Sequence, residues 1–130
     1  MAHQNQTLVQ QMFDMFRRGE REQAAGMFAE DAVFSYPGPG PLKGEWRNRE
    51  GVLSFWAEQD RCSGGEFRPE MVDLVAGDRN VFLLVRVAQA GTGAWMRVVV
   101  YEISGGAIAG ATVFEADPVA AEAFFSGQAT

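Results

Sequence analysis

Hydrophobic residues recur with helical spacing in the first half of this 130-residue chain and alternate with a period of two in its second half. The helical spacing is clearest over residues 8–16 and again over residues 49–61. A shorter helix is expected over residues 21–29, followed by a strand over residues 32–36 that Pro37 ends. The pattern therefore predicts helix, helix, strand and helix before the strand-rich half.

Single residues indicate where these elements begin and end. We expect Asn5 and Asn48 to cap the first and third helices, because an asparagine side chain can accept a hydrogen bond from the free amides of the first turn. Gly19, after two arginines, is a stop signal for the first helix. The run Pro37-Gly-Pro-Gly-Pro41 predicts a rigid loop, since its prolines cannot donate backbone hydrogen bonds.

The second half predicts four strands, over residues 67–76, 80–89, 94–104 and 107–115. Gly77-Asp78 and Gly105-Gly106 are turn signals that join these strands into hairpins, and residues 91–93 connect the two hairpins. Asp117 as N-cap and Pro118 in the first turn predict a short helix at the end of the chain.

Helices grouped before a meander of strands predict an α+β fold, in which one curved, mostly antiparallel sheet wraps three N-terminal helices. The chain shows no internal repeat, low-complexity tract or linker. A single domain over residues 1–130 is therefore expected, and that length is enough to bury a core without a metal or disulfide.

Charge and composition exclude several classes of function. The net charge of -6 and the isoelectric point near 4.7 argue against binding to nucleic acid or to membrane surfaces. No apolar run approaches the roughly 20 residues that span a bilayer. The single cysteine, Cys62, excludes an internal disulfide and predicts a reducing, cytoplasmic location. Metal-ligand spacings and phosphate-binding glycine loops are absent from the sequence, so neither a metal nor a cofactor is expected.

Four segments carry a resemblance to a known family. They are residues 9–19 (VQQMFDMFRRG), 27–34 (MFAEDAVF), 51–56 (GVLSFW) and 114–117 (FEAD). With the order of the elements, they resemble the SnoaL-like branch of the nuclear transport factor 2-like superfamily over nearly the whole chain. The resemblance implies a cone-shaped α+β barrel with an apolar cavity, paired into a dimer through the outer face of its sheet. Relatives include ketosteroid isomerases, polyketide cyclases, epoxide hydrolases, dehydratases and proteins without known activity, so the resemblance implies a fold rather than one reaction.

The ketosteroid isomerases use an aspartate base and an oxyanion hole made of a tyrosine and a protonated aspartate. The matching positions in this chain look like Tyr36 for the base, and Met12 and Arg97 for the oxyanion hole. Methionine cannot donate a hydrogen bond, and a neutral tyrosine is a poor base at neutral pH. That mechanism is therefore not expected here.

The alternation over residues 94–104 places Arg97, Val99 and Tyr101 on one face, and the resemblance implies that this face lines the cavity. Their counterparts on the last strand are Ala109, Ala111, Val113 and Glu115. The substrate pocket is expected to be bounded by Met12, Phe16, Trp56, Val99, Tyr101, Ala111 and Val113. The small residues at 109–111 are expected to leave room in it.

Four residues are candidates for chemistry, each with a structural alternative. Arg97 and Glu115 either meet a ligand inside the cone or form an ion pair, because an unpaired charge in an apolar interior is costly. The hydroxyl of Tyr36 either donates to a ligand oxygen or lies in water while the ring packs in the core. Asp117 is either an acid or base, or simply the cap of its helix.

Two functional hypotheses follow. The first is a small cofactor-independent enzyme of cyclase, isomerase or hydrolase type, which acts on an apolar polyketide-like or terpenoid-like molecule by acid–base chemistry. In that mechanism Glu115 is the base, and Tyr36 or Arg97 stabilises the oxygen that gains charge. The second is a non-catalytic small-molecule-binding or structural dimer. Either protein is expected to be a homodimer, because an apolar outer face is predicted for the sheet, made of Phe82, Leu84, Met96, Val98 and Val100.

Overall fold

A computed structural model describes residues 2–89 and 93–126; the connection expected at residues 91–93 lies largely outside this part of the chain. Within it the chain forms four helices and six strands. The helices are α1 (Ala2–Arg17), α2 (Arg21–Ala25), α3 (Asn48–Cys62) and α4 (Pro118–Phe125). The strands are β1 (Phe28–Tyr36), β2 (Gly44–Arg47), β3 (Arg68–Ala76), β4 (Asn80–Gln89), β5 (Gly93–Ser104) and β6 (Ala107–Glu115).

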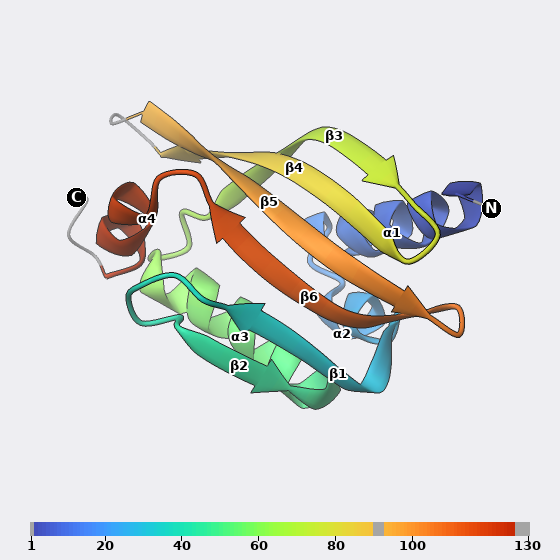
Figure 1. The fold of residues 1–130 in the computed structure, drawn as a ribbon. Helices are drawn as coiled ribbons and strands as arrows, with labels where there is room; N and C mark the ends of the chain where they lie inside the picture. The colour runs from blue at the N-terminus through green and yellow to red at the C-terminus, as the bar shows by residue number, and fades with distance from the viewer. Residues whose placement is uncertain (1, 90–92, 127–130) are drawn as a thin grey trace.

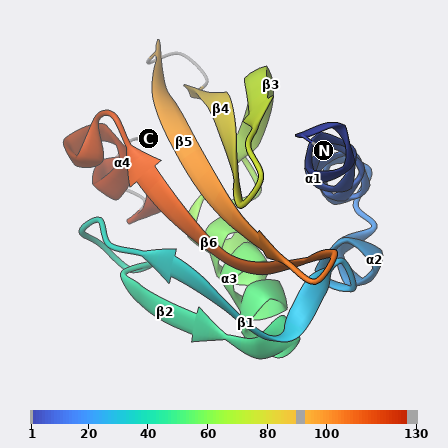
Figure 2. The same ribbon diagram turned by 45° about the vertical axis from the view of Figure 1, so that its right-hand side comes forward.

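The six strands form one sheet in the order β2-β1-β6-β5-β4-β3 (Figure 1). Neighbouring strands are antiparallel except for β1 and β6, which run parallel. The sheet curves strongly but does not close, so that β2 and β3 are its edges (Figure 2). The predicted α+β class and the curved, mostly antiparallel sheet are confirmed.

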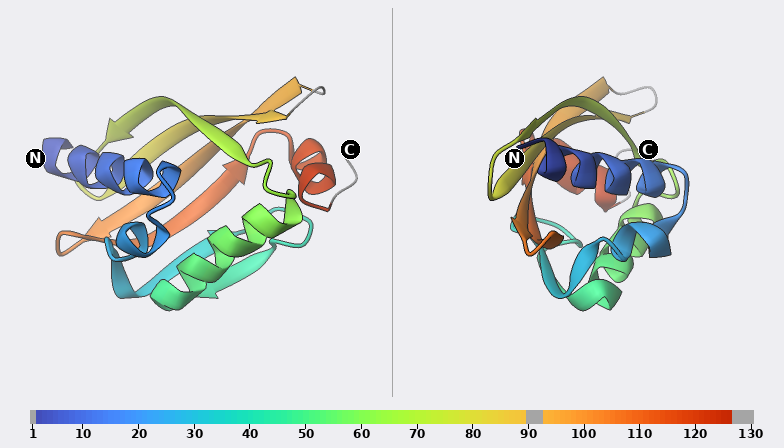
Figure 3. Two further views of the ribbon diagram at one scale, coloured as in Figure 1. Left: turned by 180° about the vertical axis from the view of Figure 1, so that it is seen from behind. Right: turned by 90° about the vertical axis from the view of Figure 1, so that its right-hand side faces the viewer.

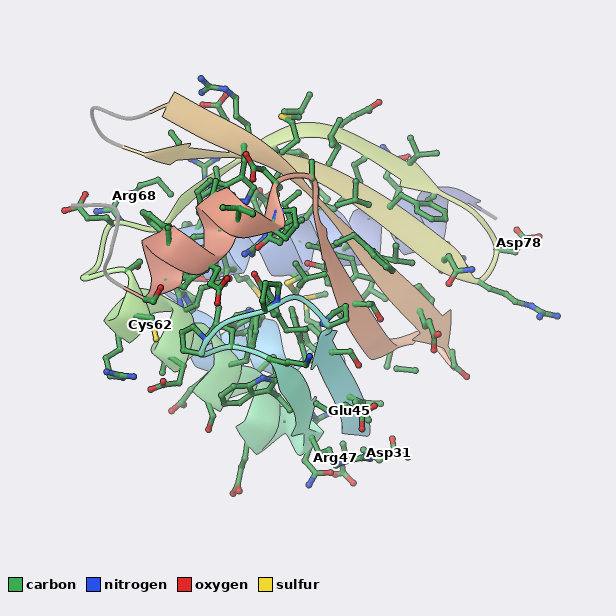
Figure 4. All side chains as sticks on the ribbon, turned by 60° about the vertical axis from the view of Figure 1, so that its left-hand side comes forward. Asp31, Glu45, Arg47, Cys62, Arg68 and Asp78 are labelled. Carbon is green, nitrogen blue, oxygen red and sulfur yellow. The ribbon has the colours of Figure 1, made fainter. Side chains whose placement is uncertain are left out.

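Helices cover the concave side of the sheet. Seen from behind, α1 lies against the β3 and β4 side and α3 against the β1 and β2 side, while α4 lies at the end near the C-terminus (Figure 3). The core fills the space between these layers. Labelled charged residues such as Asp31, Arg47 and Asp78 project outward instead (Figure 4).

The period-two patterns identify the buried face of the central strands correctly. On β4 the inward residues Val81, Leu83, Val85 and Val87 are at most 2% exposed, whereas Phe82, on the outward face, is 45% exposed. On β5 the inward set begins at Trp95 and continues through Arg97, Val99 and Tyr101. Because the cross-strand pairs are Val81↔Tyr101 and Leu83↔Val99, the two strands present one continuous inner surface.

The two predicted asparagine caps are wrong. Helix α1 begins at Ala2, so Asn5 lies inside it and donates from its side chain to the carbonyls of Gly77 and Asp78 in the β3–β4 turn. Asn48 is the first residue of α3 and has a φ of 69°, a left-handed conformation that asparagine tolerates better than most residues. Neither the long-range contact of Asn5 nor the backbone conformation of Asn48 is revealed by spacing along the chain.

The first strand and its neighbour also differ from the prediction. The second helix stops at Ala25, and β1 already begins at Phe28 because its first residues join β6, with the Ile108 amide donating to the Met27 carbonyl. Strand β2, Gly-Glu-Trp-Arg, was not predicted. It is a short edge strand whose residues are mostly exposed, so no alternation of polar and apolar residues indicates it.

A bulge changes the inward face of β6. Tyr101 pairs with Ala111 and Glu102 with Gly110, but Ile103 pairs with Ile108, which leaves Ala109 as an extra residue. Ile108 is therefore fully buried, and Ala109 is not part of the inward set that continues at Ala111. The alternation predicted for this strand holds from Ala111 to Glu115 and fails before it.

Candidate functional site

A buried ion pair joins β5 to the last residue of β6. Arg97 and Glu115 are cross-strand partners on the inward face, so their side chains meet directly. Arg97 Nε donates to Glu115 Oε1 at 2.9 Å and Nη2 donates to Oε2 at 2.7 Å, a bidentate pair. The two side chains are only 4% and 3% exposed. The prediction that these residues share one interior face is realised as an ion pair.

The Glu115 carboxylate accepts two further hydrogen bonds. Tyr36 Oη donates to Oε2 at 2.7 Å, and Trp95 Nε1 donates to Oε1 at 2.9 Å. Each carboxylate oxygen therefore accepts two bonds, which accounts for its lone pairs. Burial alone would raise the pKa of Glu115, but the charge of Arg97 and the hydrogen bonds from Arg97, Tyr36 and Trp95 together hold that pKa below its usual value. Glu115 is thus an anchored anion.

Tyr36 is one of the three residues, with Arg97 and Trp95, that anchor Glu115. It is the last residue of β1, next to the loop that starts at Pro37, and it is 1% exposed. Burial, and then the negative charge of Glu115 and the hydrogen bond to it, raise the pKa of Tyr36 far above neutral. Its hydroxyl stays protonated and donates to Glu115.

The far side of the Arg97 guanidinium meets α3 and several aromatic rings. Nη1 donates to Gln59 Oε1 at 2.8 Å. The guanidinium carbon lies 5.0 Å from the ring centroid of Phe67 and 5.6 Å from that of Phe125 on α4, within cation–π range. Phe125 also packs against Trp95, so α4 closes this end of the cone with aromatic side chains.

A cavity lies between the helices and the inner surface of the sheet. From the helices, Met12, Phe13 and Phe16 of α1 and Phe55, Trp56 and Gln59 of α3 line it. Their rings pack tightly: Phe16 and Trp56 meet edge to face, with centroids 5.1 Å apart. The cavity volume is about 30 Å³, room for about two water molecules.

From the strands, the cavity is lined by Phe34, Leu83, Val85, Arg97, Val99 and Tyr101, with Phe67 and Pro69 at the β3 side. Of the seven pocket residues predicted from the sequence, Met12, Phe16, Trp56, Val99 and Tyr101 lie here.

Ala111 and Val113 are buried in the core at 3% and 1% exposure but do not line the cavity. Beside Ala111, its parallel partner Phe34 fills the inner space. At Gly110, an added Cβ would lie 3.3 Å from the Val33 carbonyl oxygen. The small residues of β6 thus allow β1 to approach closely, and the expectation that they leave room in the pocket is wrong.

Three polar groups in the cavity lining make no hydrogen bond to another described residue. Because Arg97 has only donors, the Gln59 oxygen must face it, which leaves the Gln59 amide nitrogen free. The Tyr101 hydroxyl and the Trp56 indole nitrogen also have no partner in the described part of the chain. Every fully buried side-chain nitrogen or oxygen there is hydrogen-bonded, so a water-sized molecule must be able to reach these three groups.

Gln59 was not recognised from the sequence. It follows Val52, Phe55 and Trp56 on the buried stripe of α3 and is only 2% exposed. The available signal was a polar residue at a position where helical spacing predicts an apolar one.

Burial raises the pKa of Tyr101, with a smaller opposing effect of Arg97, so the Tyr101 hydroxyl stays protonated at neutral pH.

Asp117 lies outside this site. It is exposed, and its carboxylate accepts a hydrogen bond from the Ala120 amide at 3.0 Å as the N-cap of α4. The geometry therefore shows Asp117 as the cap of its helix, which is the structural alternative given above.

Among the described residues, no group of three or more His, Cys, Asp and Glu side chains is arranged to hold a metal ion. No helix in that part of the chain is long and apolar enough to cross a membrane.

The chain is similar to several known proteins and matches one protein family. An uncharacterised protein of Mycobacterium tuberculosis is 25% identical over 123 residues, which are 92% of this chain and 94% of that protein. The solved structure of Bal32a, from a soil-derived mobile gene cassette, has a TM-score of 0.86 at 21% identity and covers 95% of this chain and 98% of its own. A candidate ketosteroid isomerase of Kribbella flavida has a TM-score of 0.75 at 22% identity, covering 89% of this chain and 80% of its own. The SnoaL-like domain matches residues 9–111, and the chain therefore belongs to the SnoaL-like domain family.

Proposed function

We propose that this protein binds a small, largely apolar molecule inside the cone and holds its polar end with hydrogen-bond donors of Gln59 and Tyr101. One observation carries the proposal: the lining of an otherwise almost entirely apolar cavity includes Gln59 and Tyr101, and neither the Gln59 amide nitrogen nor the Tyr101 hydroxyl has a hydrogen-bond partner among the described residues. An apolar pocket with a few convergent polar groups is the usual form of a small-molecule site. At about 30 Å³, the cavity admits such a molecule only after side chains shift, and Met12 is flexible enough to do so.

Binding is favoured over acid–base catalysis by the state of the interior carboxylate. General-base catalysis works best with a group whose pKa lies near the working pH. Glu115 has a lowered pKa, four hydrogen-bond donors around it and no position in the cavity lining. In the lining, burial raises the pKa of Tyr101, so its hydroxyl keeps its proton at neutral pH, and the guanidinium of Arg97 donates to Glu115 and Gln59.

A fragment screen tests the proposal. We expect saturation-transfer NMR to detect neutral fragments bound to the wild-type protein. The Val99→Phe variant should lose them, because the larger ring fills the cavity. Val72→Phe is the matched control, since Val72 is 51% exposed and outside the cavity. Fragments that bind Val99→Phe as well as wild type, with both variants folded, would place the binding site elsewhere.

Catalysis on a polyketide-like or terpenoid-like substrate is the second candidate. Arg97 favours it, because a permanent cation in the cavity lining could stabilise charge on a bound oxygen. Incubating the fragment hits with the protein and following them by NMR tests for turnover. If Glu115 is the base, Glu115→Gln should slow that turnover by roughly tenfold to a thousandfold. Bound fragments that stay unchanged support binding alone.

The cytoplasmic location expected from the single cysteine stays a prediction.

A further inference from the structure

The polar groups of the cavity lining that have no partner among the described residues can all donate a hydrogen bond. The Gln59 amide nitrogen and the Trp56 indole nitrogen can only donate, while the Tyr101 hydroxyl can donate or accept. The Gln59 oxygen already accepts one hydrogen bond, from Arg97, so the amide nitrogen is the part of this side chain without a partner among the described residues. A molecule that satisfies these groups must therefore carry a hydrogen-bond acceptor.

The charge of the site is already balanced. Arg97 is the charged residue of the described cavity lining, and two of its nitrogens are engaged by the Glu115 carboxylate. The remaining nitrogen, Nη1, already donates to Gln59. An anionic ligand would have to leave water for an aromatic cavity without displacing Glu115 from Arg97, which is unfavourable.

We infer that the cavity selects neutral molecules with a single oxygen acceptor, such as ketones, over carboxylates of the same shape. Gln59 and Tyr101 are the residues that determine this specificity. The acceptor oxygen lies between the Gln59 amide and the Tyr101 hydroxyl, and the apolar body lies against the rings of Phe16 and Trp56. The inference rests on the proposed function and adds the chemical class of the ligand to it.

Three probes of one shape test this inference: cyclohexanone, methylenecyclohexane and cyclohexanecarboxylate. The alkene leaves water more readily than the ketone for reasons unrelated to the protein, so the informative quantity is the ratio of their dissociation constants. Tyr101→Phe and Gln59→Glu each remove a donor, and the glutamate still offers Arg97 an acceptor. Each variant should shift the ratio against the ketone by about threefold to tenfold, the usual worth of one hydrogen bond.

Gln11→Glu is the control for the added charge, because Gln11 is exposed on α1 outside the cavity, and it should leave the ratio unchanged. Wild type should bind cyclohexanecarboxylate at least tenfold more weakly than cyclohexanone. A ratio that is the same in wild type, Tyr101→Phe and Gln59→Glu would overturn the inference and leave the proposed binding function intact. Tighter binding of the carboxylate would do the same. Failure of all three probes and of the fragment screen would instead overturn the proposed function.

Discussion

Tyr36 and Tyr101 are both nearly buried, at 1% and 5% exposure, but their hydroxyls have opposite environments. Tyr36 donates to a carboxylate, whereas Tyr101 has no partner among the described residues. Tyr36→Phe should therefore lower the free energy of unfolding by about 1.5–3 kcal/mol, the usual worth of a hydrogen bond to a charged group. Tyr101→Phe should be neutral or slightly stabilising. Urea unfolding of both variants checks this, and an equal loss in the two would mean that the Tyr101 hydroxyl is bonded after all.

Glu115→Gln tests the anchor. Near neutral pH the variant should lose about 3–5 kcal/mol of unfolding free energy, because it leaves the buried Arg97 without its counter-charge. The pKa of Glu115 is lower in the folded protein than in the unfolded chain, so its contribution is present above about pH 4.3 and is lost as the pH falls through the folded value.

The stability gap between wild type and Glu115→Gln should accordingly shrink as the pH falls below about 4. Denaturant unfolding at pH 7, 5 and 3 measures it. Glu70→Gln, at an exposed position on β3, controls for the loss of a carboxylate and should show no comparable gap. A Glu115→Gln gap that stays constant down to pH 3 would contradict the lowered pKa.

At the scale of elements, the sequence predicts those parts whose signals are local. The β5–β6 hairpin follows from period-two alternation around Gly105-Gly106, and α4 from Asp117-Pro118. The alternation also predicts that Arg97 and Glu115 share a face. It does not reveal the bulge at Ala109, because the extra residue exists only relative to β5.

The same distinction applies to the candidate site. Parity along β5 places Val99 and Tyr101 on the inner surface, where the structure has them. The engagement of all the lone pairs of Glu115 depends on Tyr36 from β1, 79 residues away in sequence, and on Trp95. Contacts of that range depend on how the sheet curves, and no local pattern in the sequence encodes them.

Packing of α3 on β2 gives a prediction that opposes helix propensity. Alanine is preferred over glycine in a helix by about 1 kcal/mol, so Gly51→Ala would stabilise an isolated helix. Here a Cβ at Gly51 would lie 2.7 Å from the Trp46 carbonyl carbon. We expect Gly51→Ala to lower the melting temperature and to cost about 1–3 kcal/mol, as overpacking does. Ser54→Ala, at an exposed position of the same helix, should not; if both variants gain stability, helix and strand are less closely packed than described.

At the scale of the whole molecule, the outer face of the sheet carries an apolar strip. Val75 pairs with Phe82 and Phe82 with Val100, while Phe114 pairs with Val98. Three of these, Val75, Phe82 and Phe114, are 45–57% exposed. Such a strip on a sheet is costly to leave in water, and a second copy of the same face would cover it.

We therefore expect a homodimer through this strip, as predicted from the alternation that places Phe82 and Met96 on the outer face. Met96→Asp should shift the mass measured by light scattering at micromolar concentration from dimer to monomer, because it would bury a charge in the interface. Ser104→Asp, at the exposed end of the same strand, is the matched control and should stay dimeric. A monomeric wild type would contradict the prediction.

The central claim is that donors of Gln59 and Tyr101 are left for a guest in the cavity, while Glu115 is held away from it. The most direct measurement is a high-resolution crystal structure of the protein soaked with cyclohexanone. The account predicts density in the cavity, with an oxygen within hydrogen-bond distance of the Gln59 amide nitrogen and the Tyr101 hydroxyl, and Glu115 still bonded to Arg97, Tyr36 and Trp95. A cavity without density, or a ligand oxygen bonded to a Glu115 released from Arg97, would contradict it.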